Sequence, residues 1–467
     1  MANPSSPSRM LDEAASEIRA LAGASWRGEI TAAVGMLMKA RGLERRLSVG
    51  DMCDVLREDG TKLKCQVVAV NNESTSLMSF GGTEGVSVGS VVEYRGVQSQ
   101  VRICDGWIGR VVNALGEPID NNGPLPEGAF ATPLKNTPPP AVARRRVGPA
   151  LPTGVRAVDV FAPICRGQRM GVFAGSGVGK STLLSMLARS SAADVNIIGL
   201  VGERGREVQE FLQRDLGESG LAKSIVIVAT SDESPLARRQ AAYLTLAAAE
   251  DQRKRGRNVF CMIDSVTRFA HALREIGLAV GEPPSARGYP PSVFAELAHL
   301  LERAGPGINQ QGDITMAATI LVDGDDHDEP IGDAVRGILD GHIVLDRKIA
   351  MRGRYPAMDI LGSISRLAPD CYENEKRAAL VSMARNTVST FEDKQEIIQL
   401  GLYKLGADAK VDAAIRLYPE IENFLRQGRN EMILPDEAFA ALAEIMDVDL
   451  SSSDETAVVE APLVEEL

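Results

Sequence analysis

The sequence predicts a multidomain α/β protein with an N-terminal β-barrel, a central domain built on a mostly parallel sheet, and a C-terminal helical domain. Three observations lead to this fold class. Short strands fill the chain before residue 96, apolar segments alternate with helices between residues 169 and 322, and helical spacing takes over after about residue 370. The 467 residues are also more than one hydrophobic core usually serves.

The first segment, residues 1–27, contains an amphipathic stripe. Met10, Leu11, Ala14, Ile18 and Leu21 recur at helical spacing, which predicts a helix over residues 9–22. Such a helix either binds a partner or docks on its own domain, and the sequence favours neither alternative.

Residues 28–96 predict the β-barrel domain. Leu63, Cys65 and Val67 alternate with Lys64 and Gln66, and Gly, Asn and Asp residues separate the short strands. A Pro-rich passage at 132–141 predicts an extended linker that wraps to the next domain. That central domain is assigned to residues 97–369.

The central domain shows regular alternation of strands and helices, which is typical of a parallel sheet. Buried strands are predicted at Arg169–Ala174, Ile197–Val201, Ser224–Thr230, Val259–Ile263 and Ile314–Val322. One connecting helix is predicted to begin with Ser234 and Pro235 and to end at the basic run 253–255.

The last two segments are predicted to be a helical domain, residues 370–450, and a disordered acidic tail, residues 451–467. Helical stripes indicate the first: Leu380, Met383, Ala384, Val388 and Phe391, then Phe439, Leu442, Ala443 and Met446. The tail SSSDETAVVEAPLVEEL lacks a pattern that would form a core.

Composition narrows the possible functions. No apolar stretch approaches the ~20 residues needed to span a bilayer, and the N-terminus does not resemble a signal peptide, so we expect a cytoplasmic protein. The net charge of −12 disfavours nucleic acid as the main substrate. The six cysteines are widely spaced, and we expect reduced, mostly buried thiols rather than a zinc site.

The strongest chemical signal is a phosphate-binding loop between a strand and a helix. The loop comprises Gly175, Ser176, Gly177, Val178, Gly179, Lys180, Ser181 and Thr182, with Ala174 in place of the first glycine of the strict pattern. Its glycines let backbone N–H groups surround phosphate oxygens. Lys180 is expected to reach the β- and γ-phosphates of ATP, and the Ser181 hydroxyl to bind Mg²⁺. The central domain is therefore predicted to be a RecA-like P-loop ATPase domain.

Two acidic residues follow predicted strands, at the edge where α/β sheets bind ligands. Asp264 follows the strand at 259–263 and is expected to hold Mg²⁺ through water; the alternative is a helix cap. Glu203 is the candidate for orienting the attacking water. Its alternative is an ion pair with Arg204 or Arg206.

At this point the residues resemble the catalytic subunits of rotary ATPases, and most closely the ATPases of flagellar and type III protein export. The resemblance covers nearly the whole chain. The matching segments are GWIGRVVNALGEPIDNNGPL, LPTGVRAVDVFAPICRGQRMGVFAGSGVGKSTLL, GERGREVQEF, DSVTRFAHALREIGLAVGEPPSARGYPPSVFAEL and DGDDHDEPIGDAVRGILDGHIVLDR.

The resemblance implies residue roles and a ring. Glu203 and Arg204 fall at the family's water-activating glutamate and neighbouring arginine. Arg366 falls at the arginine finger that acts in trans on a neighbour's nucleotide, which implies a homo-oligomer of six copies. Tyr355 resembles the aromatic residue that stacks on adenine, although a half-buried core tyrosine is the alternative. The segment at 287–291 resembles the family segment that faces the central hole of the ring. The chain departs from many relatives at residues 309–313 and at the nearby Gly332. These departures affect the expected contacts with the pore and do not affect the expected catalysis.

The resulting hypothesis is a cytoplasmic ATPase of a flagellar export apparatus, peripherally associated with the inner membrane. Implied partners are a regulator on the N-terminal helix, a rotor-like coiled-coil stalk, chaperone–cargo complexes and a membrane-embedded export gate. The alternatives are the ATPase of a virulence injectisome, a Rho-like RNA translocase, and a non-catalytic ring subunit. The excess of acidic residues argues against the translocase. The presence of Lys180, Glu203, Asp264 and Arg366 argues against the non-catalytic subunit.

Overall fold

The computed structural model describes residues 26–96, 100–322 and 329–450. These divide into two compact units. The first comprises the described residues up to 100 with 233–236 and 275–283, and the second comprises the other described residues. The predicted helix at 9–22 and the predicted acidic tail lie outside the described residues.

The first unit contains the closed β-barrel that the sequence predicted. Its antiparallel strands are β1 (Arg27–Val34), β2 (Leu37–Arg41), β3 (Met52–Leu56), β4 (Lys62–Val70), β5 (Thr75–Ser79) and β6 (Val91–Gly96), in the order β1-β2-β5-β4-β3-β6. Leu63, Cys65 and Val67 point into the barrel core, while Lys64 between them is exposed. The alternation follows from the two-residue period of a strand.

The second unit contains a nine-stranded sheet with the path β17-β16-β10-β15-β13-β11-β12-β8. Its strands are β8 (Val111–Asn113), β10 (Arg169–Ala174), β11 (Val195–Glu203), β12 (Ser224–Thr230), β13 (Val259–Asp264), β14 (Gly305–Pro306), β15 (Asp313–Leu321), β16 (Gly341–Leu345) and β17 (Met358–Ser365). All pairings are parallel except those of β14 and β17. The five predicted buried strands are all present.

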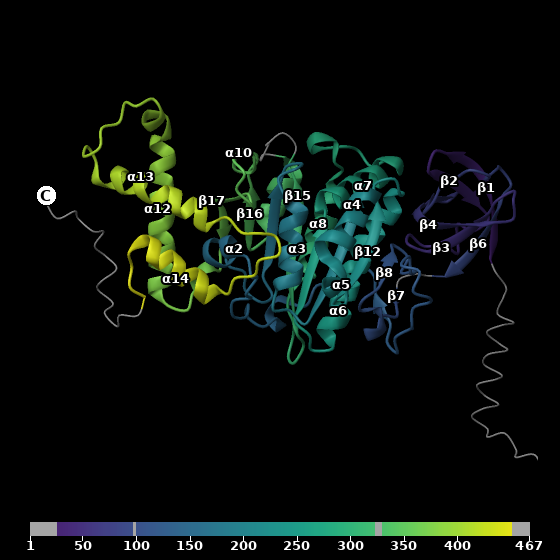
Figure 1. Ribbon diagram of the computed structural model, residues 1–467. Coiled ribbons are helices and arrows are strands. Elements are labelled where there is room, and N and C mark those ends of the chain that lie inside the picture. Colours follow the sequence, from purple (N-terminus) through teal and green to yellow (C-terminus); the bar gives the residue numbers. More distant parts are fainter. Residues whose placement is uncertain (1–25, 97–99, 323–328, 451–467) are drawn as a thin grey trace, which may run out of the picture. The chain divides into compact units, whose positions relative to one another are not determined.

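Helices connect these strands (Figure 1). They are α2 (Arg156–Phe161), α3 (Lys180–Ser190), α4 (Gly205–Glu210), the π-helical turn η3 (Phe211–Leu216), α5 (Gly217–Leu221), α6 (Pro235–Lys254), α7 (Val266–Ala279), α8 (Pro291–Glu302), α9 (Pro330–Ile338), α10 (Arg347–Met351) and α11 (Ala368–Cys371). Smaller elements are the strand pair β7 (Gln100–Val101) and β9 (Thr132–Pro133), and the 3-10 turns η1 (Asp105–Trp107), η2 (Ala141–Ala143) and η4 (Ala286–Gly288). Helix α6 begins and ends where the sequence predicted.

The C-terminal helices are α12 (Glu375–Gln399), α13 (Ala409–Phe424) and α14 (Pro435–Met446). They lie beside the β17 edge of the sheet, where α12 contacts β17 and α14 contacts α2 (Figure 1). Leu380, Ala384 and Phe439 are buried in the same apolar cluster as the central strands. The helical segment therefore shares a core with the sheet.

The expectation of reduced thiols is wrong for one pair. Cys165, which precedes β10, and Cys371, the last residue of α11, form a disulfide. They are 206 residues apart in the sequence, so only the fold brings them together. The other four cysteines are free thiols, and Cys53, Cys65 and Cys261 are buried as expected.

Among the described residues, none of the helices is long and apolar enough to cross a membrane.

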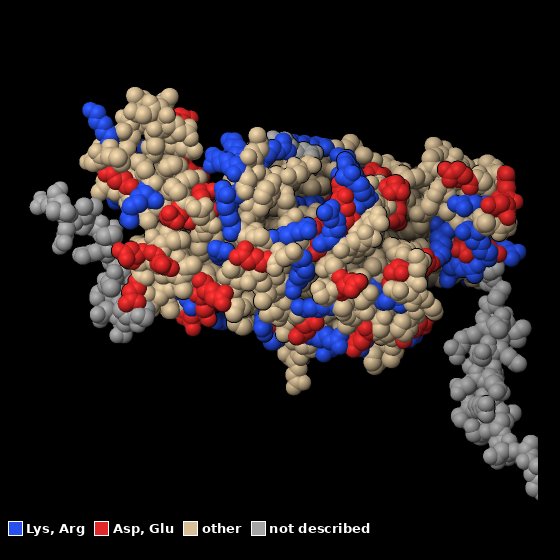
Figure 2. All heavy atoms as spheres, viewed as in Figure 1, with Lys and Arg blue, Asp and Glu red and all other residues tan. Residues whose placement is uncertain are grey.

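The charge on the surface is unevenly distributed, although the net charge of the chain is −12. Figure 2 shows Lys and Arg side chains gathered over the upper middle of the face in view, on the second unit. This surface is more basic than the overall charge implies.

Candidate nucleotide site

The loop between β10 and α3 has the conformation that phosphate binding requires. Gly177 and Gly179 have φ of 78° and 92°, a region that residues with a Cβ rarely adopt. Space around Gly177 is open, since a Cβ built there would meet no atom within 4 Å. Lys180 is the first residue of α3, so the helix N-terminus with its free N–H groups faces the loop.

Lys180 is held between two carboxylates. Its Nζ donates to Asp264 Oδ1 at 2.5 Å and to Glu203 Oε1 at 3.1 Å. Burial alone would lower the pKa of Lys180, but the two carboxylates outweigh it and the pKa is raised. The lysine is therefore a permanent cation at this site.

Asp264 ends β13, at the carboxyl edge of the sheet, and is almost fully buried. Besides Lys180, Thr319 on the neighbouring strand β15 donates to its Oδ1 at 2.7 Å. The helix-capping alternative is not what the structure shows, because the N–H of Arg268 on α7 bonds to Ser265 Oγ. Asp264 is thus oriented toward the loop by its neighbours.

Glu203 ends β11, where the pairing with β12 shifts register after Val201. Burial and repulsion by Asp264 raise the pKa of Glu203 to about 7, with Lys180 opposing the shift. The ion-pair alternative fails here: Arg204 lies 3.8 Å from Glu207 and Arg206 lies 3.7 Å from Glu210. Arg204 is largely exposed beside the site.

Tyr355 approaches the loop from the other side. A Cβ on Gly179 would lie 3.2 Å from Cδ1 of the Tyr355 ring, so the ring lies against the loop. The residue is half exposed. A partly exposed aromatic side chain beside the loop can contact a flat ligand.

Arg366 is not brought to this cluster within the chain. It follows β17, and its backbone N–H bonds to Asp340 while its guanidinium donates to the Arg336 carbonyl at 3.2 Å. Strand β17 runs antiparallel to β16 and pairs Ser365 with Gly341, which pairs with Met170 at the start of β10. The loop follows the other end of β10, so Arg366 lies at the opposite edge of the sheet.

Ser181 and Asp264 supply the kinds of donor that suit Mg²⁺, a hydroxyl and a carboxylate beside a phosphate loop. Within the described part of the chain, three or more His, Cys, Asp or Glu side chains are never grouped as a metal site. A P-loop site fits this pattern, because nucleotide phosphates and water complete the coordination. The residues present therefore fit a nucleotide-bound Mg²⁺.

Sequence reasoning missed two residues that support the site. Thr319 lies in a strand that was predicted, but its bond to Asp264 depends on which strands are neighbours. Gln427, in the turn after α13, donates its backbone N–H to the Tyr355 carbonyl at 2.9 Å. Neither residue belongs to a local motif that would have marked it.

Comparison with known proteins gives three family models along the chain. They are the ATP synthase alpha/beta family β-barrel domain at residues 30–96, the nucleotide-binding domain of the same family at 154–365, and the type III secretion EscN ATPase C-terminal domain at 374–444. A relative from Caulobacter vibrioides, named "Flagellum-specific ATP synthase", is 52% identical over 90% of this chain and 95% of its own length. The chain belongs to the flagellar and type III secretion ATPase family.

Further relatives of this ATPase agree with that assignment. The "Flagellum-specific ATP synthase" of Bacillus subtilis is 45% identical over 90% of this chain and 94% of its own. The "Type 3 secretion system ATPase" of Xanthomonas euvesicatoria is 42% identical over 92% and 96%. The assembled ATPase EscN of enteropathogenic E. coli superposes with a TM-score of 0.84 at 37% identity, covering 90% of this chain and 99% of EscN. The protein is an ATP-hydrolysing enzyme with the fold that the sequence predicted.

Proposed function

We propose that this ATPase energises a flagellar protein-export apparatus as a homohexamer that uses Mg²⁺-bound ATP. The observation that carries the catalytic part is the cluster of Lys180, Glu203 and Asp264, joined by bonds of 3.1 and 2.5 Å next to an open phosphate loop. Glu203 and Asp264 come from the carboxyl ends of the adjacent strands β11 and β13, and Lys180 follows the loop at the carboxyl end of β10 in the same sheet. This convergence is typical of P-loop catalysis.

ATP is proposed to bind with its phosphates in the loop formed by Gly175, Ser176, Gly177, Val178, Gly179, Lys180, Ser181 and Thr182. Lys180 then exchanges its carboxylate partners for β- and γ-phosphate oxygens, and Tyr355 stacks on adenine. Mg²⁺, held by Ser181 and by Asp264 through water, would neutralise charge that develops on the phosphates.

Once Lys180 has turned to the phosphates, Glu203 is free to orient the attacking water. A carboxylate with a raised pKa is a better proton acceptor than an ordinary glutamate. Arg204, exposed next to Glu203, is proposed to assist at the same position. The residues thus supply phosphate binding, water orientation and charge balance.

Arg366 is proposed to stabilise the transition state on a neighbouring copy. Its position at the far edge of the sheet supports action in trans, since the side chain cannot cross the length of β10 to its own loop. The active unit is then a ring in which each site takes residues from two subunits. The relative EscN has been solved as an assembled ATPase and in complex with its central stalk, which supports a ring and a rotor-like coiled-coil stalk here.

We propose the remaining partners by analogy with this family. They are a regulator on the N-terminal helix, chaperone–cargo complexes, and a membrane-embedded export gate that keeps the cytoplasmic ring at the inner membrane. Higher identity to the Caulobacter flagellar relative (52%) than to the Xanthomonas secretion relative (42%) favours the flagellar system over an injectisome. The test is ATP-dependent release of flagellar cargo from its chaperone. Hydrolysis without release would contradict the export role.

The shared-site ring has its own test, which is steady-state hydrolysis against protein concentration for wild type, Glu203→Gln, Arg366→Ala and an equal mixture of the two variants. Rates should rise cooperatively with concentration, since assembly follows mass action. Each variant alone should be inactive, and the mixture should partly recover, because some interfaces then combine an intact Glu203 with an intact Arg366. A mixture as inactive as its components would contradict the shared site.

A further inference from the structure

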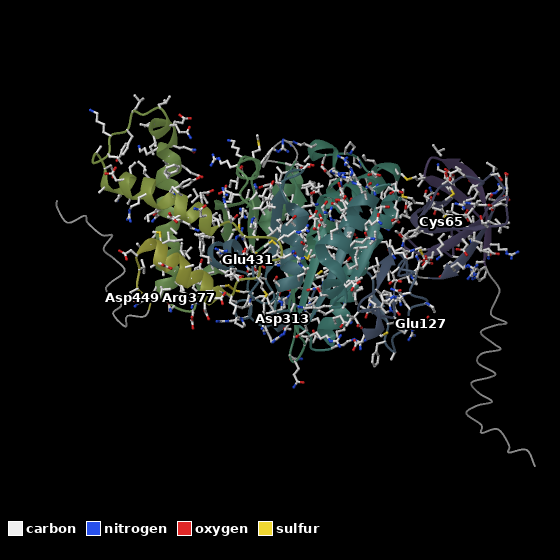
Figure 3. All side chains as sticks on the ribbon, viewed as in Figure 1. Cys65, Glu127, Asp313, Arg377, Glu431 and Asp449 are labelled. Atoms are coloured by element: carbon white, nitrogen blue, oxygen red, sulfur yellow. A yellow bond between two sulfur atoms is a disulfide. The ribbon has the colours of Figure 1, made fainter. Side chains whose placement is uncertain are left out.

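The turn at residues 426–431, between α13 and α14, reaches from the helical segment to the nucleotide site. Glu431, labelled in Figure 3, lies where this turn meets the central strands and helices. We call it the 426–431 turn. None of the site residues predicted from the sequence belongs to it.

Gln427 is the centre of the turn and is buried. Its Oε1 accepts the Arg156 N–H at 2.8 Å, and its Nε2 donates to the carbonyls of Gly154 at 2.7 Å and of Glu431 at 3.0 Å. Its backbone N–H donates to the Tyr355 carbonyl at 2.9 Å. One residue therefore joins the loop before α2, the turn itself and the segment that carries Tyr355.

Other bonds fix the turn to the same surroundings. The Arg156 guanidinium lies 3.2 Å from Glu431, and Arg189, in the last turn of α3, donates to Asn430 Oδ1 at 3.2 Å and to the Arg429 carbonyl. Because α3 begins at Lys180, the turn is fastened to the helix that follows the phosphate loop. Its position is thus set relative to the site.

The Tyr355 segment has a second attachment to the same helices. Arg354 is buried, and its Nε lies 3.2 Å from Glu422 Oε2 on α13. Tyr355 is 44% exposed, so its ring is only partly held by packing. Its backbone is held instead, by Gln427 at the carbonyl and by the preceding Arg354.

We propose that Gln427 is a positioning residue for Tyr355. Its side-chain hydrogen bonds fix the 426–431 turn. Its backbone N–H, bonded to the Tyr355 carbonyl, then places the Tyr355 ring where it contacts a base lying over the phosphate loop. This rests on the proposed stacking of Tyr355 on adenine. Gln427 then sets affinity for the base and leaves the chemical step unchanged.

The experiment compares steady-state kinetics of Gln427→Ala, Tyr355→Ala and the double variant. We expect KM for ATP to rise roughly tenfold in Gln427→Ala, with kcat within about twofold of wild type. The double variant should be no worse than Tyr355→Ala, because residues that act through one another are not additive. Arg426→Ala, an exposed neighbour in the same turn, is the matched control and should retain the wild-type KM.

Inorganic tripolyphosphate separates positioning from general loosening, because it occupies the phosphate loop but has no base. Its inhibition constant should be unchanged in Gln427→Ala; an equal rise for ATP and tripolyphosphate would overturn the proposal. Gln427→Glu keeps the acceptor for Arg156 and should give an intermediate KM, and it carries the test if the alanine variant does not fold. An unchanged KM in Tyr355→Ala would instead refute the stacking role of Tyr355. Raised KM in Tyr355→Ala with wild-type KM in both Gln427 variants would refute only the positioning role.

Discussion

Tyr355 and Arg366 lie at opposite ends of strand β17. Met358 at its start pairs with Leu345, beside the end of β10 that leads into the phosphate loop, whereas Ser365 pairs with Gly341 at the other end. Between Gly341 and Leu345 the sheet extends four residues, roughly 13 Å at about 3.3 Å per residue. Strand β17 therefore separates Tyr355, which is proposed to contact the nucleotide of its own chain, from Arg366, which is proposed to contact the nucleotide of a neighbouring copy.

This separation predicts distinct kinetic defects. Arg366→Ala should reduce kcat by about 10³-fold or more, as loss of an arginine finger does, while nucleotide affinity of the unassembled chain stays at the wild-type value. Steady-state kinetics and equilibrium binding of a fluorescent ATP analogue measure the two quantities. Weaker nucleotide binding by monomeric Arg366→Ala would show that the arginine acts within its own chain.

The raised pKa of Glu203 predicts the acid limb of the pH profile. Since Glu203 must be ionised to accept a proton, kcat/KM should fall as pH drops through about 7, above the ordinary value of 4.5. Glu207 raises this pKa through its hydrogen bond, so Glu207→Gln should move the limb to lower pH. Glu210→Gln, which removes a partner of Arg206, is the control. A limb that stays in place in Glu207→Gln would contradict the assignment.

The raised pKa of Glu203 also predicts how the free energy of unfolding depends on pH. Because folding raises the pKa of Glu203, the folded state binds the proton more tightly than the unfolded state. The resulting contribution to the free energy of unfolding is fully present below pH 4.5 and is lost as pH rises through about 7. Glu203→Gln should remove it, and urea titrations at pH 5 and pH 8 compare the two chains.

The disulfide predicts a redox-dependent free energy of unfolding. Linking two residues 206 positions apart restricts the unfolded chain, and we expect reduction or Cys371→Ser to lower the free energy of unfolding by about 2–5 kcal/mol. Cys104→Ser, which removes a free thiol, should have a smaller effect. Alkylation of the denatured protein should label four thiols before reduction and six after it. Six before reduction would refute the bridge in the purified protein.

A buried ion pair predicts a large loss of stability. Arg303, which directly follows α8, and Glu250 on α6 are both fully buried. The Arg303 guanidinium donates two hydrogen bonds to the Glu250 carboxylate, of 2.9 and 3.0 Å. Glu250→Gln leaves the arginine charge without a counter-ion and should cost about 3–5 kcal/mol in urea unfolding. Lys135→Ala breaks an exposed pair with Glu296 and should cost at most about 1 kcal/mol. Similar losses in both variants would contradict this difference.

The sequence predicted those features of the fold and of the site that depend on a local pattern of residues. Strands β10 and β12 have the predicted bounds, 169–174 and 224–230, and the other three predicted strands differ by one or two residues at their ends, because buried parallel strands appear as apolar runs. The phosphate loop was recognisable for the same reason: its glycines and Lys180 are contiguous. Strands β16 and β17 were not predicted.

What the sequence could not predict depends on contacts between distant segments. Cys165 meets Cys371 only because α11 returns to the loop before β10, and Gln427 meets Tyr355 only because the turn after α13 reaches the sheet. Widely spaced cysteines without a motif gave no reason to expect a bridge. The pairing of Lys180 with Asp264 likewise required the order of the strands.

The bridge between Cys165 and Cys371 also changes the topology of the chain. It closes the segment carrying β10 through β17, and with it the phosphate loop and Arg366, into a covalent macrocycle. An unfoldase that pulls the polypeptide through a narrow pore from either terminus would meet this macrocycle and would have to admit two strands at once. While the bridge is intact, mechanical unfolding of the catalytic core therefore needs a pore that accepts two strands, whereas after reduction a pore for one strand is enough.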